Sequence, residues 1–99
     1  MRIEFADDIL RRAAEDPAYR PRQWGPDLLK SYRKKIAFLA QAVDDRDLRN
    51  YKALRLEKLS GDRQGTSSIR LNDQFRLILS FRTDPSGRTV IVLELVDYH

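Results

Sequence analysis

The chain contains no cysteine and a single histidine among its 99 residues. Disulfide bonds and thiolate chemistry are therefore excluded, and one histidine among scattered carboxylates offers no zinc-ligand spacing. No apolar run approaches the roughly 20 residues of a membrane helix, and acids stand near the start where a signal peptide has its apolar core. The sequence predicts a cytoplasmic protein with no metal, cofactor or membrane span.

What is present in quantity is charge. The chain carries 19 Lys and Arg against 15 Asp and Glu, a net charge of +4, and its pI is about 9.7. A basic surface attracts polyanions, which favours nucleic acid or an acidic protein as partner. The near balance of charges is equally compatible with an ordinary solvated surface. The length predicts one domain over residues 1–99 with a modest core.

The sequence predicts mainly helices in the first half of the chain. Residues 1–5 alternate apolar and charged positions and predict a short strand, and residues 9–15 predict a short helix after two aspartates. A loop around Trp24 follows. Pro26 then opens the strongest helix, residues 27–43, which carries an apolar stripe at helical spacing. The stripe consists of Leu28, Tyr32, Ile36, Leu39 and Val43.

Four cations lie off this stripe: Lys30, Arg33, Lys34 and Lys35. They form a candidate patch for RNA or for an acidic partner. A solvated helix face is the simpler interpretation and the one favoured here.

The sequence predicts strands in the second half of the chain. Period-two patterns predict strands at residues 53–57, 67–71, 74–82 and 89–96, joined by a tight turn at Asn72-Asp73 and a longer one at residues 84–87. The last strand is apolar on both faces, which is typical of an interior strand. The predicted fold is α+β, with a compact antiparallel sheet, helices packed on one face and a basin on the other.

Three blocks in this half carry candidate chemistry: Gly61-Asp62-Arg63, Ser68 to Arg76, and Asp97-Tyr98-His99. Metal-free RNA cleavage needs a base, an acid and cations for the phosphorane charge. His99 titrates near neutral pH, and the guanidinium forks of Arg70 and Arg76 suit phosphate oxygens.

Each of these residues also has a structural interpretation. Arg63 could add a cation to such a site, and Tyr98 a ring that stacks on a base. A terminal histidine is often only a frayed end. The strand arginines could simply pair with Glu94, Asp62 or Asp73 at the sheet surface.

The three blocks, in this order, resemble the HigB-type toxins of the RelE/ParE superfamily. The resemblance is close over about the last 45 residues. It implies a RelE-like fold, ribosome-dependent mRNA cleavage in the A site, and neutralisation by a HigA-like helix-turn-helix antitoxin. It places the family's strand arginines at Arg70 and Arg76 and its terminal pair at Tyr98 and His99.

The chain departs from the family pattern at one charged position. Ser60 stands where a lysine usually precedes the Gly-Asp-Arg block, with Lys58 nearby. We therefore expect Lys58, Ser60 and Arg63 to form the RNA- and phosphate-binding flank. The alternative function is a ParE-like or degenerate toxin that binds a protein target such as gyrase and cleaves no RNA.

Overall fold

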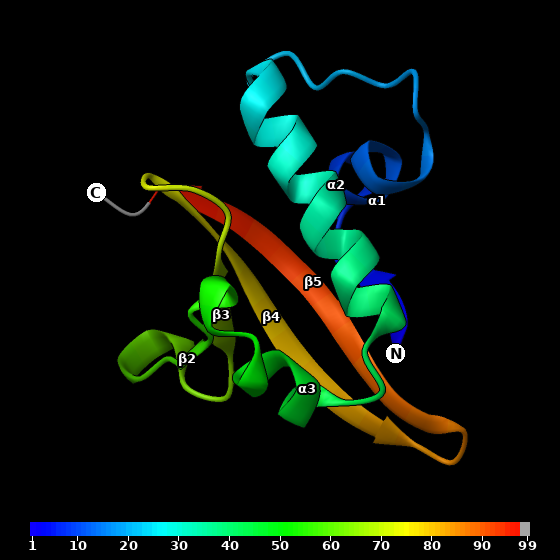
Figure 1. The fold of residues 1–99 in the computed structure, drawn as a ribbon, viewed down its shortest axis with the longest axis vertical. Coiled ribbons are helices and arrows are strands. Elements are labelled where there is room, and N and C mark those ends of the chain that lie inside the picture. The colour runs from blue at the N-terminus through cyan, green and yellow to red at the C-terminus, as the bar shows by residue number, and fades with distance from the viewer. Residues whose placement is uncertain (98–99) are drawn as a thin grey trace.

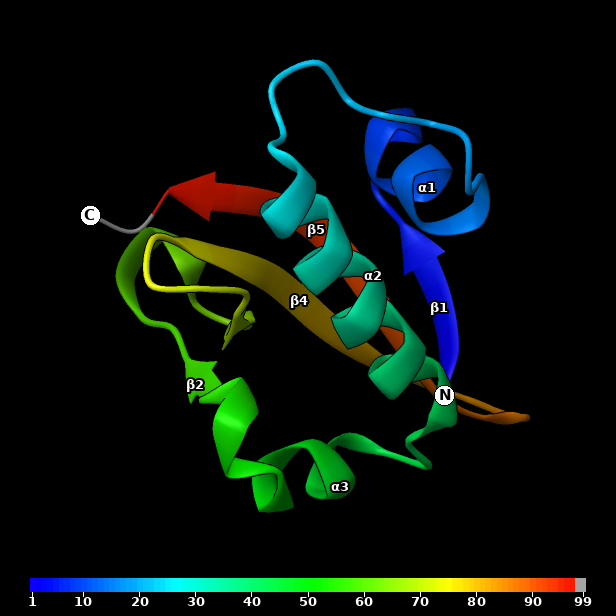
Figure 2. The same cartoon turned by 45° about the horizontal axis from the view of Figure 1, so that its top comes forward.

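The computed structural model describes residues 1–97, and all statements on structure below refer to them. Five strands form one sheet in the order β1-β5-β4-β3-β2. Helices α1 and α2 lie together, and α2 runs over β4 and β5 (Figures 1 and 2). The elements are β1 Arg2–Phe5, α1 Asp8–Glu15, α2 Pro26–Gln41, α3 Asp45–Asn50, the 3₁₀ turn η1 Lys52–Leu54, β2 Glu57–Lys58, the 3₁₀ turn η2 Gly61–Arg63, β3 Ser67–Arg70, β4 Phe75–Asp84 and β5 Gly87–Asp97.

Local sequence features determine where the two main helices, α1 and α2, begin. The Asp7 carboxylate caps α1 by accepting a hydrogen bond of 2.8 Å from the Leu10 backbone N–H, which satisfies one of the free donors at a helix start. Pro26 occupies the first turn of α2, where its missing N–H costs nothing. The predicted helices at residues 9–15 and 27–43 are thus confirmed apart from their ends.

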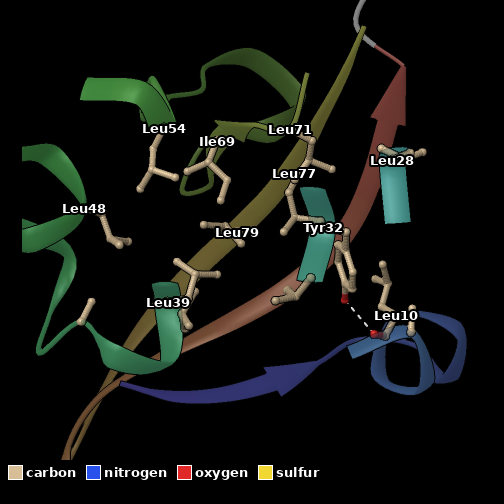
Figure 3. Close-up of a cluster of buried hydrophobic side chains, with 14 of the residues drawn as sticks. Leu10, Leu28, Tyr32, Leu39, Leu48, Leu54, Ile69, Leu71, Leu77 and Leu79 are labelled. Atoms are coloured by element: carbon tan, nitrogen blue, oxygen red, sulfur yellow. Dashed lines mark hydrogen bonds between the residues drawn. The ribbon is translucent and has the colours of Figure 1, made fainter. Parts of the chain in front are cut away.

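The core lies between α2 and the sheet. Figure 3 shows Leu28, Tyr32 and Leu39 of α2 in one buried cluster with Leu77 and Leu79 of β4. Tyr32 is fully buried, and its hydroxyl donates to the Leu10 carbonyl at 2.7 Å, tying α2 to α1. Leu48 and Leu54 extend the same core beneath α3 and η1. The α+β architecture with helices on one face is confirmed.

Three details of the expected fold are wrong. The strand predicted at residues 53–57 is instead η1 followed by a two-residue β2, because Leu54 is buried in the core and Arg55 adopts a left-handed backbone (φ 49°) that turns the chain. The sheet is mixed, because β1 pairs in parallel with β5. Val43 lies beyond the end of α2 and is 78% exposed, so it contributes nothing to the stripe.

The sheet face opposite α2 is also less open than predicted. Ile78 of β4 and Ser68 of β3 lie directly opposite each other on this face and are both buried. Glu94 of β5 is the other neighbour of Ile78, and it forms an ion pair with Arg63 of η2. The pair holds η2 to the sheet, so the expected basin is restricted to the end near the β3–β4 turn.

No helix within residues 1–97 is long and apolar enough to span a membrane. In the same part of the chain, no cluster of three or more His, Cys, Asp or Glu side chains is arranged to hold a metal ion.

Candidate active site

Arg70 and Arg76 are brought together by the β3–β4 hairpin. They are direct cross-strand partners, one at the end of β3 and the other near the start of β4. The Asn72 side-chain oxygen fixes the intervening turn by accepting from the backbone N–H groups of Gln74 (2.8 Å) and Phe75 (2.7 Å). This local hydrogen bonding is why an asparagine favours a turn here. The sequence pattern therefore predicted the pairing of these two arginines correctly.

The two arginines line a surface hollow of about 300 Å³, which we call the arginine hollow. Its lining consists of Arg55, Glu57, Arg70, Asn72, Asp73 and Arg76. Three guanidinium groups and two carboxylates thus meet around one space. Such a site can bind an anion and also hold a proton acceptor beside it.

Arg76 is largely a structural member of this site. It is only 8% exposed, and its guanidinium donates to the Ser68 hydroxyl at 2.9 Å and to the Arg55 carbonyl at 2.5 Å. Its side chain therefore crosses β3 and secures the backbone that enters β2. A buried arginine held in this way presents a fixed positive charge to the hollow.

Arg70 is the accessible cation. Its side chain is 32% exposed and pairs with Asp73, whose own side chain is 93% exposed. Its Nε also donates to the Asn72 carbonyl at 3.2 Å. An exposed ion pair is worth little, so a phosphate can replace Asp73 as the partner of Arg70 at small cost.

Glu57 is a candidate residue that the sequence reasoning missed. It lies on β2 opposite Ser68 and lines the arginine hollow. Within residues 1–97, the carboxylate of Glu57 takes part in no ion pair. The available signal was its alternation with Leu56 and Lys58, which line a different hollow on the other side of β2. The strand predicted at residues 53–57 ends at Glu57, so the prediction did not include this alternation.

The predicted flank of Lys58, Ser60 and Arg63 does not line the arginine hollow. Lys58 faces the hollow on the far side of β2. Ser60 is exposed just before η2, and Arg63 pairs with Glu94. Gly61 and Gly65 have φ values of 66° and 88°, so this loop needs glycine at both positions.

Tyr98 and His99, the predicted stacking and proton-transfer residues, lie outside the described residues. Their neighbour Asp97 ends β5 and is the register partner of Phe75. The Gln74 side-chain amide donates to the Asp97 carboxylate at 3.0 Å. The described end of β5 is therefore attached to the same turn that carries Arg70 and Arg76.

The four cations predicted as a patch on α2 do not share one role. Arg33 is an internal clamp, since its guanidinium donates to the carbonyls of Ala13 (2.9 Å) and Tyr19 (2.9 Å). Lys30 and Lys34 are exposed. Partial burial, followed by the charges of Lys34 and Arg70, lowers the pKa of Lys35. A solvated face with one structural arginine describes this helix better than a four-cation patch.

The fold is shared with solved bacterial toxins. It is similar to a YoeB/ParE toxin from Agrobacterium tumefaciens, with 15% identity, a TM-score of 0.57 and full coverage of both chains. It is also similar to the toxin fold in a YoeB–YefM heterotetramer from Staphylococcus aureus, with 22% identity, a TM-score of 0.56, and coverage of 100% of this chain and 97% of that one. At these identities the likeness establishes the fold alone.

The sequence itself identifies the family. Residues 3–99 match the profile of the HigB-like toxins, described as RelE-like toxins of the type II toxin–antitoxin system HigB. The chain belongs to this family, and the resemblance noted in its C-terminal blocks is confirmed. A comparison with curated proteins gives no significant match.

Proposed function

We propose that this toxin is a ribosome-dependent mRNA endoribonuclease that cleaves in the ribosomal A site without a metal ion. The observation that carries the proposal is the arginine hollow, in which Arg70, Arg76 and the carboxylate of Glu57 line one space. Membership of a RelE-like toxin family supports the same class of activity.

The proposed reaction is attack of a ribose 2'-oxygen on the adjacent phosphorus. Glu57 accepts the 2'-hydroxyl proton, the new O–P bond forms, and the bond from phosphorus to the 5'-oxygen breaks. His99 donates a proton to that leaving oxygen, so a cyclic phosphate and a 5'-hydroxyl result. Arg70 binds the phosphate, and the fixed charge of Arg76 stabilises the extra negative charge of the phosphorane.

We assign Tyr98, Ser60 and Arg63 contacts with RNA outside the reacting phosphate. Tyr98 stacks on or orients a base next to the scissile bond. Ser60 and Arg63 lie on the exposed segment that precedes β3, and they contact the flanking RNA backbone. This assignment follows from their position outside the arginine hollow.

Primer extension on mRNA from cells expressing the protein tests this function. The wild type should produce cuts within translated codons, and His99→Ala should remove them, because proton transfer by a placed side chain contributes roughly 100- to 10,000-fold. Glu57→Gln should have a similar effect, since an amide cannot accept the proton. Glu15→Gln makes the same change at an exposed carboxylate of α1 and should leave cleavage intact.

Growth arrest separates this function from the alternative, a toxin that acts by binding a protein target. Arrest by the wild type without any mRNA cuts would refute the nuclease assignment. So would full arrest and cleavage by both the Glu57 and His99 variants.

We further propose that a HigA-like helix-turn-helix antitoxin neutralises the protein. One structural neighbour is itself a toxin–antitoxin complex, and this chain is basic overall. Co-expression with a small helix-turn-helix protein encoded beside its gene should relieve growth arrest and yield a complex that co-elutes. Separate elution of the two proteins at micromolar concentration would contradict this.

A further inference from the structure

A second hollow, about twice the volume of the arginine hollow at about 590 Å³, lies on the other side of β2. We call it the α3 hollow, because α3 forms one wall. The segment from β2 to β3 forms another wall, and the β4–β5 hairpin contributes Phe81 and Arg88. Figures 1 and 2 show α3 and β2 on the same side of β4. Its volume lies within the range of roughly 300–1,000 Å³ that is typical of ligand-binding pockets.

The α3 hollow carries an excess of positive charge. Arg49, Lys58 and Arg88 line it against a single carboxylate, that of Asp45, so the excess is two charges. Asp45 is already engaged, with Arg88 Nε at 3.2 Å and Arg49 at 4.0 Å. No ion pair within residues 1–97 involves Lys58, which is exposed. The charge of this hollow is therefore complementary to an acidic ligand.

The apolar part of the α3 hollow indicates whether its acidic ligand is a nucleic acid or a peptide. Leu56, Leu59 and Phe81 are half-buried and line it. The Phe81 ring already has the Arg88 guanidinium over its face, 5.5 Å from the ring centre. Single-stranded nucleic acid is bound through open aromatic rings on which bases stack. Two leucines and a covered ring instead fit an aliphatic or aromatic side chain of a peptide.

We propose that the α3 hollow binds an acidic segment of a protein partner. The segment places an apolar side chain against Leu56 and Leu59 and carboxylates against Lys58 and Arg49. It thereby contacts β2, the strand whose opposite side presents Glu57 to the arginine hollow. That this partner is the antitoxin rests on the proposed function, whereas the complementarity of the hollow does not.

The binding site can be mapped by NMR on the ¹⁵N-labelled full chain. The probe is a 12-residue peptide of Glu, Asp, Leu and Phe. One control peptide replaces its acids by the corresponding amides, and another replaces its apolar residues by serine. The acidic peptide should shift the amide signals of Arg49, Lys58, Gln64 and Thr66 saturably, and each control peptide should bind at least about tenfold more weakly.

A matched pair of charge reversals tests the role of Lys58. Lys58→Glu should weaken peptide binding by about tenfold or more. Lys30→Glu makes the same change in net charge on the exposed face of α2, away from the hollow, and should change the affinity by less than about twofold. Lys58 is exposed, so its replacement leaves the core intact, and thermal unfolding of both variants checks this.

Three results would overturn the proposal. The first is equal weakening by both reversals, which indicates general charge attraction. The second is peptide-induced shifts confined to Arg70, Arg76 or α2. The third is an RNA 12-mer that shifts the α3-hollow signals when the peptide does not. Arg70→Ala separates this proposal from the nuclease assignment, because it should lose mRNA cleavage and retain peptide binding.

Discussion

Replacing Arg76 by alanine should destabilise the fold, whereas the same change at its cross-strand partner Arg70 should not. Arg76 is 8% exposed and donates to the Ser68 hydroxyl and the Arg55 carbonyl. Hydrogen bonds from charged groups contribute roughly 1.5–3 kcal/mol each, and these contributions do not simply add. We therefore expect Arg76→Ala to lower the free energy of unfolding by about 2–4 kcal/mol.

Arg70→Ala is the matched control, because it removes the same side chain from the neighbouring strand. Its main partner, Asp73, is 93% exposed, and exposed ion pairs contribute about 0–1 kcal/mol. Urea unfolding of the two variants, followed by circular dichroism, measures the contrast directly. A domain of this size has roughly 5–15 kcal/mol of stability, so both variants should remain folded at low temperature.

The contrast also determines how toxicity results are interpreted. Loss of toxicity in Arg70→Ala reports on phosphate binding, whereas loss in Arg76→Ala combines that effect with a weakened fold. The burial of Arg76, which is 8% exposed, is the reason for this difference between the two variants. Equal losses of less than about 1 kcal/mol in both variants would refute the anchoring role of Arg76.

Three further predictions follow from other contacts. Leu39→Ala should cost about 2–5 kcal/mol in urea unfolding, because Leu39 is fully buried between α2 and the sheet, and a cost below about 1 kcal/mol would contradict that packing. Hydrogen bonds from Arg82 lower the pKa of both Glu4 and Asp84 below their ordinary values of 4.5 and 3.8. The stability that these two carboxylates add to the fold is therefore complete above their ordinary pKa values. It is lost as the pH falls through their lower pKa values in the folded protein. The Glu4→Gln, Asp84→Asn double variant should accordingly unfold at lower urea than the wild type at pH 6, with a smaller difference at pH 3, and an unchanged difference would refute the linkage. Ser60→Lys should increase mRNA cleavage in primer extension by adding a cation beside the RNA path, whereas unchanged cleavage would indicate that position 60 does not approach the RNA.

The elements predicted correctly are those whose signals are local. The Asp7 cap, Pro26 at the first turn of α2 and the spacing of Leu28, Tyr32 and Leu39 act within a few residues, so they can be read without a fold. The alternation in β4, the apolar run of β5 and the turn at Asn72 are local in the same sense. These signals sufficed for the α+β class and for placing Arg70 beside Arg76.

The wrong fold predictions concern segments whose structure depends on contacts with residues far along the chain. The pattern of β1 is that of a strand, but its parallel pairing with β5, some 87 residues away, is set by where α1 and α2 return the chain. Residues 53–57 have a strand-like composition, yet burial of Leu54 in a core assembled from α2 and the sheet converts part of them into η1. Tertiary packing outweighs strand propensity at such positions.

The candidate site shows the same division between local and long-range information. The sequence by itself determined that two arginines meet at a hairpin, because strand register follows from a short turn. Only the tertiary structure decided that Arg76 is buried as an anchor while Arg70 stays accessible, and that β2 presents Glu57 to one hollow and Lys58 to another. The physical reason is that period-two alternation assigns a side chain to a face, whereas its exposure, partners and charge environment depend on which distant segments cover that face.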